Sequence, residues 1–257
     1  NNRDLYFIGG IAVNSLGHGV PEIVGAIAQQ TAKLIHVSNL YHTTPHVLLA
    51  QLLVEHAFPS KIFFCNSGSE SIEAALKFTR KWAFGIGGED KHEIISFEHS
   101  FHGRTYGAIS ATAQPKYHEG FKPMVPGMVY LPYNDIDALD QAVSAERTAT
   151  VIIEPVQGEG GVNTVQGEFL KHLRMLCDER QVALIFDEIQ CGLCRTGKFF
   201  AYQHHGIEPD VMTLAKPLAG GLPIGAVMMK PHIAEALKPG MHGSTFGANP
   251  VACHTAL

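Results

Sequence analysis

The sequence lacks an apolar stretch long enough for a membrane helix. No run approaches the ~20 apolar residues that span a bilayer, and no charged segment followed by an apolar one opens the chain. Basic charge is not in excess, because 24 acidic residues outnumber 19 basic ones and the formal charge is -5. We therefore expect a cytoplasmic protein with neither a membrane nor a nucleic acid as its partner.

The sequence also lacks a disulfide framework. Its five cysteines are odd in number and scattered along the chain, unlike those of a small disulfide-stabilised domain. Cys191 and Cys194 form one CxxC, but no second CxxC and no matching histidine pair completes a zinc site. A redox pair or half a zinc site remains the alternative to two ordinary thiols on a turn. We favour the ordinary thiols and expect no metal.

The 257 residues can bury a core as one large domain or as two small ones. The chain begins at Asn1 without a methionine and ends at Leu257 inside "NPVACHTAL", which is typical of a new helix. We therefore expect a fragment, and a function that needs residues beyond either end is conditional.

Short apolar runs alternate with amphipathic stretches along most of the chain, which predicts an α/β fold with a mostly parallel sheet flanked by helices. In such folds ligands gather beyond the carboxyl ends of the strands. The predicted strands are Lys61–Cys65, Glu93–Phe97, Met128–Leu131, Thr150–Glu154, Val182–Asp187, Val211–Leu214 and Ile224–Met229. The predicted helices are Pro21–Ile35, Pro45–Phe58, residues 66–69 to about Trp82, Asp135–Val143 and Glu168–Arg180.

The first of three informative strand ends lies in "FFCNSGSESIEAALKF", where a strand turns into a helix. Free N–H groups at a helix start, with the hydroxyls of Ser67 and Ser69, suit a phosphate group. The turn is not a Walker A loop, because no Gly-Lys-Ser/Thr follows. Serine and glycine are also common at ordinary helix starts, so this pattern alone leaves both interpretations open.

The second and third strand ends supply an acid and an amine. In "VALIFDEIQCG", Asp187 and Glu188 follow an apolar strand, where a carboxylate needs a partner such as a protonated pyridine nitrogen or a metal ion. In "DVMTLAKPLAGGLPIGA", Lys216 follows another strand. An apolar setting disfavours its ammonium form, which makes the nucleophilic amine accessible for Schiff-base chemistry with an aldehyde. A surface lysine is the common alternative, but the three strand ends together favour one site.

Seven stretches occur in the order found in one enzyme family and cover nearly the whole chain. They are "GGIAVNSLGHG", "FFCNSGSESIEAALKF", "SFHGRTYGA", "IIEPVQGEGGV", "LIFDEIQCGLCRTG", "LAKPLAGGLPIGAV" and "HGSTFGANP". With them the sequence resembles the fold-type I, class III aminotransferases, which use pyridoxal 5'-phosphate (PLP) and act on terminal amino groups. The resemblance implies a PLP-binding major domain at residues 41–257, incomplete at its C-terminus. Residues 1–40 would belong to the small domain or the dimer contact, and the C-terminal domain would be missing.

The resemblance also implies roles for residues at the cofactor. Lys216 matches the lysine that forms the Schiff base and moves the proton between substrate and cofactor. Asp187 matches the acid that pairs with the pyridinium nitrogen, which lets the ring accept electrons. Gln190 matches a residue that bonds the ring hydroxyl, and Gly68 and Ser69 match the phosphate cradle.

Further matches concern the substrate and a second subunit. Phe101 resembles the aromatic residue that stacks on the cofactor ring, a core phenylalanine being the alternative. Arg104 resembles the arginine that clamps a substrate carboxylate. Thr245 matches a threonine that reaches the phosphate of the neighbouring subunit, which implies a homodimer with shared sites. Glu154 matches a residue near the cofactor, and Glu159 one that pairs with an arginine near the C-terminus.

Together these matches imply transfer of the terminal amino group of N-acetylornithine, or of a similar ω-amino acid, to 2-oxoglutarate in arginine biosynthesis. The products would be a semialdehyde and glutamate. The alternatives are ornithine, 4-aminobutyrate or carrier-linked lysine aminotransferases, a semialdehyde aminomutase, or an inactive fragment of one of these. A magnesium-dependent nucleotide hydrolase would use Asp187 as a ligand, but the phosphate loop is absent. We interpret His102, beside Phe101, as a packing residue.

Overall fold

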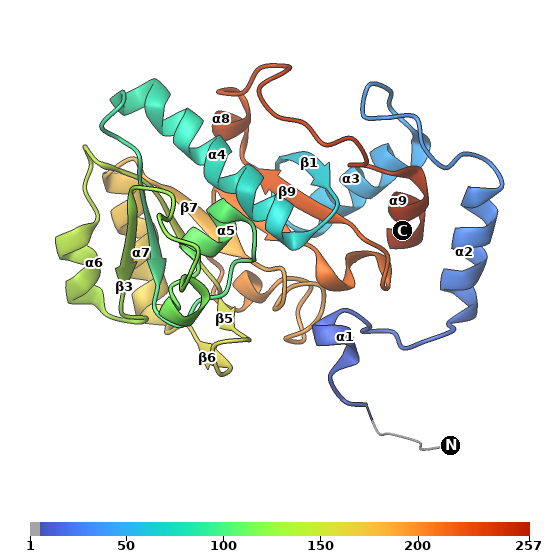
Figure 1. The fold of residues 1–257 in the computed structure, drawn as a ribbon, viewed down its shortest axis with the longest axis horizontal. Helices are drawn as coiled ribbons and strands as arrows, with labels where there is room; N and C mark the ends of the chain where they lie inside the picture. The colour runs from blue at the N-terminus through green and yellow to red at the C-terminus, as the bar shows by residue number, and fades with distance from the viewer. Residues whose placement is uncertain (1–5) are drawn as a thin grey trace.

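The strands predicted from apolar runs are present in the computed structural model, which describes residues 6–257 (Figure 1). Four of the seven predicted strands have the predicted bounds, and the other three differ by one or two residues at an end. Two short strands, at residues 156–157 and 163–164, were not predicted. The strands are β1 (Lys61–Cys65), β2 (Glu93–Phe97), β3 (Met128–Leu131), β4 (Thr148–Ile153), β5 (Val156–Gln157), β6 (Asn163–Thr164), β7 (Ala183–Asp187), β8 (Val211–Leu214) and β9 (Gly225–Met229).

The longer helices also lie where helical spacing predicts them. Helix α4 continues to Gly87 rather than ending near Trp82, and α2 ends at Thr31 rather than Ile35. The helices are α1 (Gly9–Ala12), α2 (Pro21–Thr31), α3 (Thr44–His56), α4 (Gly68–Gly87), α5 (Tyr106–Ala111), α6 (Ile136–Ala142), α7 (Gly167–Glu179), α8 (Pro231–Ala234) and α9 (Pro250–Ala256). Three short 3-10 turns are η1 (Pro115–Tyr117), η2 (Ala201–His204) and η3 (Lys216–Ala219).

One seven-stranded sheet organises the chain, in the order β1-β9-β8-β7-β4-β2-β3. Strands β8, β7, β4, β2 and β3 run parallel to one another, whereas β9 is antiparallel to both β8 and β1. The prediction of an α/β fold with a mostly parallel sheet is confirmed. Because parallel strands end at the same edge, residues that follow β4, β7 and β8 are brought together in space.

Both faces of the sheet are buried. Successive side chains of a strand point to opposite sides, and every residue of β7 is buried. In β7, Leu184 and Phe186 belong to one hydrophobic cluster, and Ala183 and Ile185 belong to the other. This is the arrangement that strands apolar at every position predict. Asp187 is the next residue on the side of Ala183 and Ile185.

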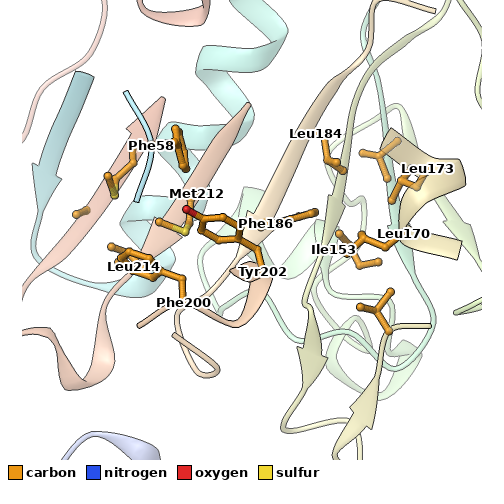
Figure 2. Close-up of a cluster of buried hydrophobic side chains, with 14 of the residues drawn as sticks. Phe58, Ile153, Leu170, Leu173, Leu184, Phe186, Phe200, Tyr202, Met212 and Leu214 are labelled. Carbon is orange, nitrogen blue, oxygen red and sulfur yellow. The ribbon is translucent and has the colours of Figure 1, made fainter. Parts of the chain in front are cut away.

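Helices on the two faces complete these clusters. On one face, Figure 2 shows Ile153 and Leu184 next to Leu170 and Leu173 of α7. On the other face, α4 contributes residues that include Ile72, Ala75 and Phe78. Each fully buried leucine or phenylalanine contributes about 1.5–3 kcal/mol of burial free energy. Packing on both faces therefore holds the strand ends at fixed positions.

The N-terminal helices lie at the side of the sheet (Figure 1). Helices α2 and α3 both pack against α9, the helix predicted from "NPVACHTAL". The division into residues 1–40 and residues 41–257 stays a prediction, and residues 1–5 of the first segment lie outside the described residues.

Among residues 6–257, no helix combines the length and the apolarity that crossing a membrane requires. The same residues contain no group of three or more His, Cys, Asp or Glu side chains placed to hold a metal ion.

Candidate active site

A cavity of about 330 Å³ lies where the three informative strand ends meet. Its walls come from residues 66–69, 101–103, 187, 189–190, 215–216 and 221–224, together with Val13 and Glu154. The segments that follow β1, β7 and β8 are therefore side by side, although they are far apart in the sequence. Of the ten residues predicted for the site, the cavity gathers Gly68, Ser69, Phe101, Glu154, Asp187, Gln190 and Lys216.

One wall is the N-terminus of α4. The Ser67 side chain caps this helix by accepting a hydrogen bond from the Glu70 N–H at 3.2 Å. The first N–H groups of a helix have no intrahelical partner, so those of Gly68 and Ser69 are suited to an anion. Helix α4 has 20 residues, and the partial positive charge at the N-terminal end of its dipole also favours an anion.

The turn opposite α4 approaches so closely that only glycine fits. Gly103 has a φ of +130°, and a Cβ atom at this position would lie 2.4 Å from Ser69 Oγ. The next residue, Arg104, donates its backbone N–H to Ser69 Oγ at 3.2 Å. The glycine of "SFHGRT" therefore lets the two loops close around the helix terminus.

Asp187 ends β7 and is only 3% exposed. Its Oδ1 accepts hydrogen bonds from the Ile189 N–H at 3.1 Å and from Thr213 Oγ1 at 3.2 Å. Its Oδ2 lies 2.7 Å from Nδ1 of His102. A buried carboxylate requires hydrogen-bond partners, and the protein itself provides three of them for Asp187.

His102 is the residue whose importance the sequence analysis underestimated. It is 2% exposed and lines the cavity, and its contact with Asp187 makes the packing interpretation wrong. Its Nε2 is buried without a hydrogen-bond partner in the part of the chain that the structure describes. The cost of burying Asp187 indicated that some partner exists, but nothing in the sequence distinguished this histidine from the other 14.

Lys216 begins η3, separated from the end of β8 by Ala215, and lines the same cavity as Asp187. Burial lowers the pKa of its ammonium group, although the carboxylates of Asp187 and Glu154 act in the opposite direction. Its φ of 28° is positive, which is uncommon for a residue other than glycine. Such backbone strain is typical of functional positions. The lysine is therefore held as an amine that loses its proton more readily than a surface lysine.

Glu154 lies deep in the cavity and accepts a hydrogen bond from the Phe101 N–H at 3.0 Å. Burial and the neighbouring charge of Asp187 raise the pKa of Glu154 well above its usual value, while the Phe101 N–H and Lys216 act in the opposite direction. This carboxyl group therefore keeps its proton to a higher pH than an exposed glutamate does.

Glu188 serves the fold rather than the cavity. Its carboxylate accepts hydrogen bonds from the N–H groups of Ala201 and Tyr202, both at 2.7 Å. Of the two adjacent acids, only Asp187 lines the cavity. Burial raises the pKa of Glu188 to about 7, although the two backbone N–H groups lower it.

Three predicted site residues do not line this cavity. Arg104 stacks beside Phe101 with its Cζ 5.4 Å from the ring centroid, at the rim of the site. Glu159 accepts hydrogen bonds from neighbouring side chains. Thr245 lines a second cavity of about 300 Å³, and Asn66 lines both cavities.

The two CxxC thiols differ in their surroundings. Cys191 is buried and Cys194 is exposed, and both are free. Burial raises the pKa of Cys191 well above its usual value, which makes that thiol unreactive. This agrees with the interpretation as ordinary thiols.

A family model described as "Aminotransferase class-III" matches residues 1–257. The chain belongs to the class III aminotransferase family. It is 52% identical to acetylornithine aminotransferase from Methanocaldococcus jannaschii over 98% of its own length. It is 51% identical to succinylornithine transaminase from Photorhabdus laumondii over 97% of its length. The chain spans 63% and 62% of these two relatives.

Solved structures of the family share the fold. Ornithine aminotransferase from Toxoplasma gondii aligns with a TM-score of 0.92 at 36% identity, covering 97% of this chain and 60% of that one. Acetylornithine aminotransferase from Elizabethkingia anophelis aligns with a TM-score of 0.83 at 34% identity, with the same coverage.

PLP, the cofactor of class III aminotransferases, fits the residues around the cavity. The helix terminus at Gly68 and Ser69 suits a phosphate, and the side chains of Phe101 and Ile189 offer apolar walls for a flat ring. Asp187 supplies a buried anion for a protonated ring nitrogen. Lys216, which follows a different strand, supplies an amine that can react with the aldehyde of PLP.

The contact between His102 and Asp187 should be measurable as a coupling in stability. In a double-mutant cycle with His102→Leu and Asp187→Ala in the cofactor-free protein, we expect an interaction energy on the order of 1–3 kcal/mol, because both groups are buried. Denaturant unfolding of the four proteins gives this value.

The exposed ion pair between Arg147 and Glu93, with an N–O distance of 3.0 Å, is the matched control. Its cycle should give less than about 1 kcal/mol. Additive effects of His102→Leu and Asp187→Ala would contradict the contact.

The raised pKa of Glu188 predicts a specific pH dependence. The folded state binds this proton more tightly than the unfolded state, whose ordinary value is 4.5. The resulting stabilisation is complete below pH 4.5 and is lost as the pH rises through 7. In Glu188→Gln this side chain does not titrate. The difference in unfolding free energy, wild type minus variant, should therefore fall by on the order of 3 kcal/mol over this range. Urea unfolding at several pH values checks this, and a constant difference would refute it.

Proposed function

We propose that this chain carries the cofactor site of an aminotransferase that moves the terminal amino group of an N-acylated ornithine to 2-oxoglutarate. The single observation that carries the proposal is that Lys216 and Asp187, from separate strand ends, line one cavity with the N-terminus of α4. The names of two relatives, acetylornithine aminotransferase and succinylornithine transaminase, share an N-acylated ornithine as the donor. N-acetylornithine is the donor that we favour, with a semialdehyde and glutamate as products.

When bound, PLP supplies an aldehyde that condenses with amines and a pyridinium ring that accepts electrons from the reacting carbon. On this proposal, Gly68 and Ser69 hold the phosphate with their N–H groups at the start of α4. Phe101 packs against the ring, and Gln190 binds the ring hydroxyl. Each of these residues lines the cavity, which supports the assignment.

Lys216 is the catalytic base in this proposal. Because its pKa is lowered by burial, its Nζ reaches the neutral state at less cost than a surface lysine does. A neutral Nζ can attack a carbonyl carbon, and it can take a proton from substrate and return it to another atom. Removing this amine removes both roles.

Asp187 keeps the ring nitrogen protonated in this proposal. Its Oδ1 is oriented by the Ile189 N–H and by Thr213, and its Oδ2 is oriented by His102. These hydrogen bonds fix the orientation of the carboxyl group, so that it faces the cavity in which a cationic ring nitrogen would lie. His102 is a positioning residue because it acts through Asp187.

Arg104 holds a substrate carboxylate in this proposal, since a guanidinium can form two parallel hydrogen bonds to one carboxylate. Thr245 lines a separate cavity, which is compatible with a role in binding the phosphate of the neighbouring subunit. We therefore propose a homodimer with shared sites. We also propose that residues 41–257 form the major domain, residues 1–40 contribute to the small domain or the dimer contact, and the enzyme acts in the cytoplasm in arginine biosynthesis.

The role of Lys216 can be tested directly. Reduction with borohydride in the presence of PLP should attach the cofactor to the Lys216 peptide, as detected by mass spectrometry. Lys216→Ala should lose this attachment and about 10³-fold or more of the transamination rate. Lys171→Ala, at an exposed lysine of α7, should change neither.

The assay should use the 257-residue chain and the complete product of its gene. Rates with acetylornithine, succinylornithine, ornithine and 4-aminobutyrate then rank the donors. Attachment to another lysine in both forms, or an unaltered rate in Lys216→Ala, would refute the proposed site. A higher rate with 4-aminobutyrate than with both acylated ornithines would refute the proposed donor.

A further inference from the structure

The guanidinium of Arg104 is held by an aromatic cleft rather than by an ion pair. Its Cζ lies 4.0 Å from the ring centroid of Tyr117 and 5.4 Å from that of Phe101. The two rings are nearly perpendicular, with centroids 6.0 Å apart. A cation over an aromatic face is attracted by the ring quadrupole. The side chain is therefore supported on its flat face.

The other end of Tyr117 is fixed by Glu159. The Tyr117 hydroxyl donates a hydrogen bond to Glu159 Oε1 at 2.6 Å, and Gln114 Nε2 donates to Glu159 Oε2 at 2.6 Å. Partial burial acts to raise the pKa of Glu159, but these hydrogen bonds, together with the charges of Lys116 and Arg104, lower the pKa below its ordinary value. Glu159 is thus an ionised anchor for the tyrosine near neutral pH.

This anchor is itself attached to the frame of the site. Gln114 Nε2 also donates to the backbone carbonyl of Ser100 at 2.9 Å, next to the cavity residue Phe101. Tyr117 belongs to η1, which Gln114 precedes. The ring under Arg104 is therefore connected by three successive hydrogen bonds, through Glu159 and Gln114, to the segment that forms the cavity wall.

A simple surface ion pair between Arg104 and Glu159 would be the ordinary explanation for this cluster. Within residues 6–257, however, the cation that pairs with Glu159 is Lys116, whose Nζ lies 4.0 Å from Oε1, and no Arg104–Glu159 pair falls within that distance. Both Glu159 oxygens also accept hydrogen bonds. Stacking uses the flat face of a guanidinium and leaves its N–H edges available. Those edges form the fork that matches a carboxylate.

We propose that Tyr117 is the positioning residue that presents Arg104 to the carboxylate of the substrate. The ring supports the guanidinium, and the hydroxyl keeps the negative charge of Glu159 away from it. Tyr117 thereby sets the affinity of the site for carboxylate-bearing substrates, both the amino donor and the oxo-acid acceptor. This inference rests on the role proposed above for Arg104.

Glutarate is a suitable probe, because it is a dicarboxylate without an amino or oxo group and cannot react. In the complete, PLP-loaded enzyme, Tyr117→Leu should weaken glutarate binding by about 5- to 30-fold, as expected for loss of a cation–π contact. The KM for 2-oxoglutarate should rise by a similar factor while kcat stays within about twofold. Calorimetry gives the dissociation constant, and steady-state kinetics give the other two values.

Two further variants separate the ring from the hydroxyl. Tyr117→Phe keeps the ring but frees Glu159 to pair with Arg104, so glutarate binding should weaken. Adding Glu159→Gln to Tyr117→Phe should restore binding toward the wild-type value, because the competing charge is gone. Tyr106→Leu, at a tyrosine that is 61% exposed, is the matched control and should change glutarate binding less than twofold.

The outcomes distinguish this inference from the function on which it rests. If Arg104→Leu abolishes glutarate binding while Tyr117→Leu leaves it unchanged, the role of Tyr117 is refuted and that of Arg104 stands. If neither variant alters glutarate binding, both roles are refuted. If Tyr117→Leu does not fold, the test is whether adding Glu159→Gln to Tyr117→Phe restores glutarate binding. If binding is not restored, the proposal is overturned.

Discussion

The rest of the site depends on one buried negative charge. Asp187 lies at the end of a strand that is apolar on both faces, where an ionised carboxylate is costly unless its charge is compensated. His102, Thr213 and the Ile189 N–H provide hydrogen bonds for it. These bonds orient the carboxylate toward a cavity that suits a cationic ring. The acid is therefore stabilised by the fold and ready for a cofactor.

The fold meets this constraint by joining remote segments at one edge of the sheet. Parallel β7 and β8 deliver Asp187 and Lys216 to the same cavity, and two hydrophobic clusters fix those strands from both faces. Gly103 lets the opposite loop approach the start of α4. Next to the cavity, Tyr117 also holds charged groups in fixed positions. Its ring contacts the guanidinium of Arg104, and its hydroxyl donates a hydrogen bond to Glu159.

Local pattern was sufficient for the seven strands of the main sheet and for the three strand ends, but not for the short pair β5 and β6. Apolar runs reveal buried strands because both faces of this sheet are covered, and turn residues mark where the strands stop. The contact between His102 and Asp187 joins positions 85 residues apart, so no local period predicts it. The hydrogen bonds of Tyr117 and Gln114 to Glu159 likewise join positions 42 and 45 residues apart, so local pattern does not predict them. Family resemblance supplied Arg104 and Thr245, whose chemistry the isolated residues do not reveal.

The central claim is that Asp187 holds a protonated ring nitrogen. The most direct measurement is the ¹⁵N chemical shift of ring-labelled PLP bound to the complete enzyme, in the wild type and in Asp187→Ala, near neutral pH. The account predicts a protonated nitrogen in the wild type and an unprotonated one in the variant. An unprotonated nitrogen in the wild type, or the same shift in both proteins, would contradict it.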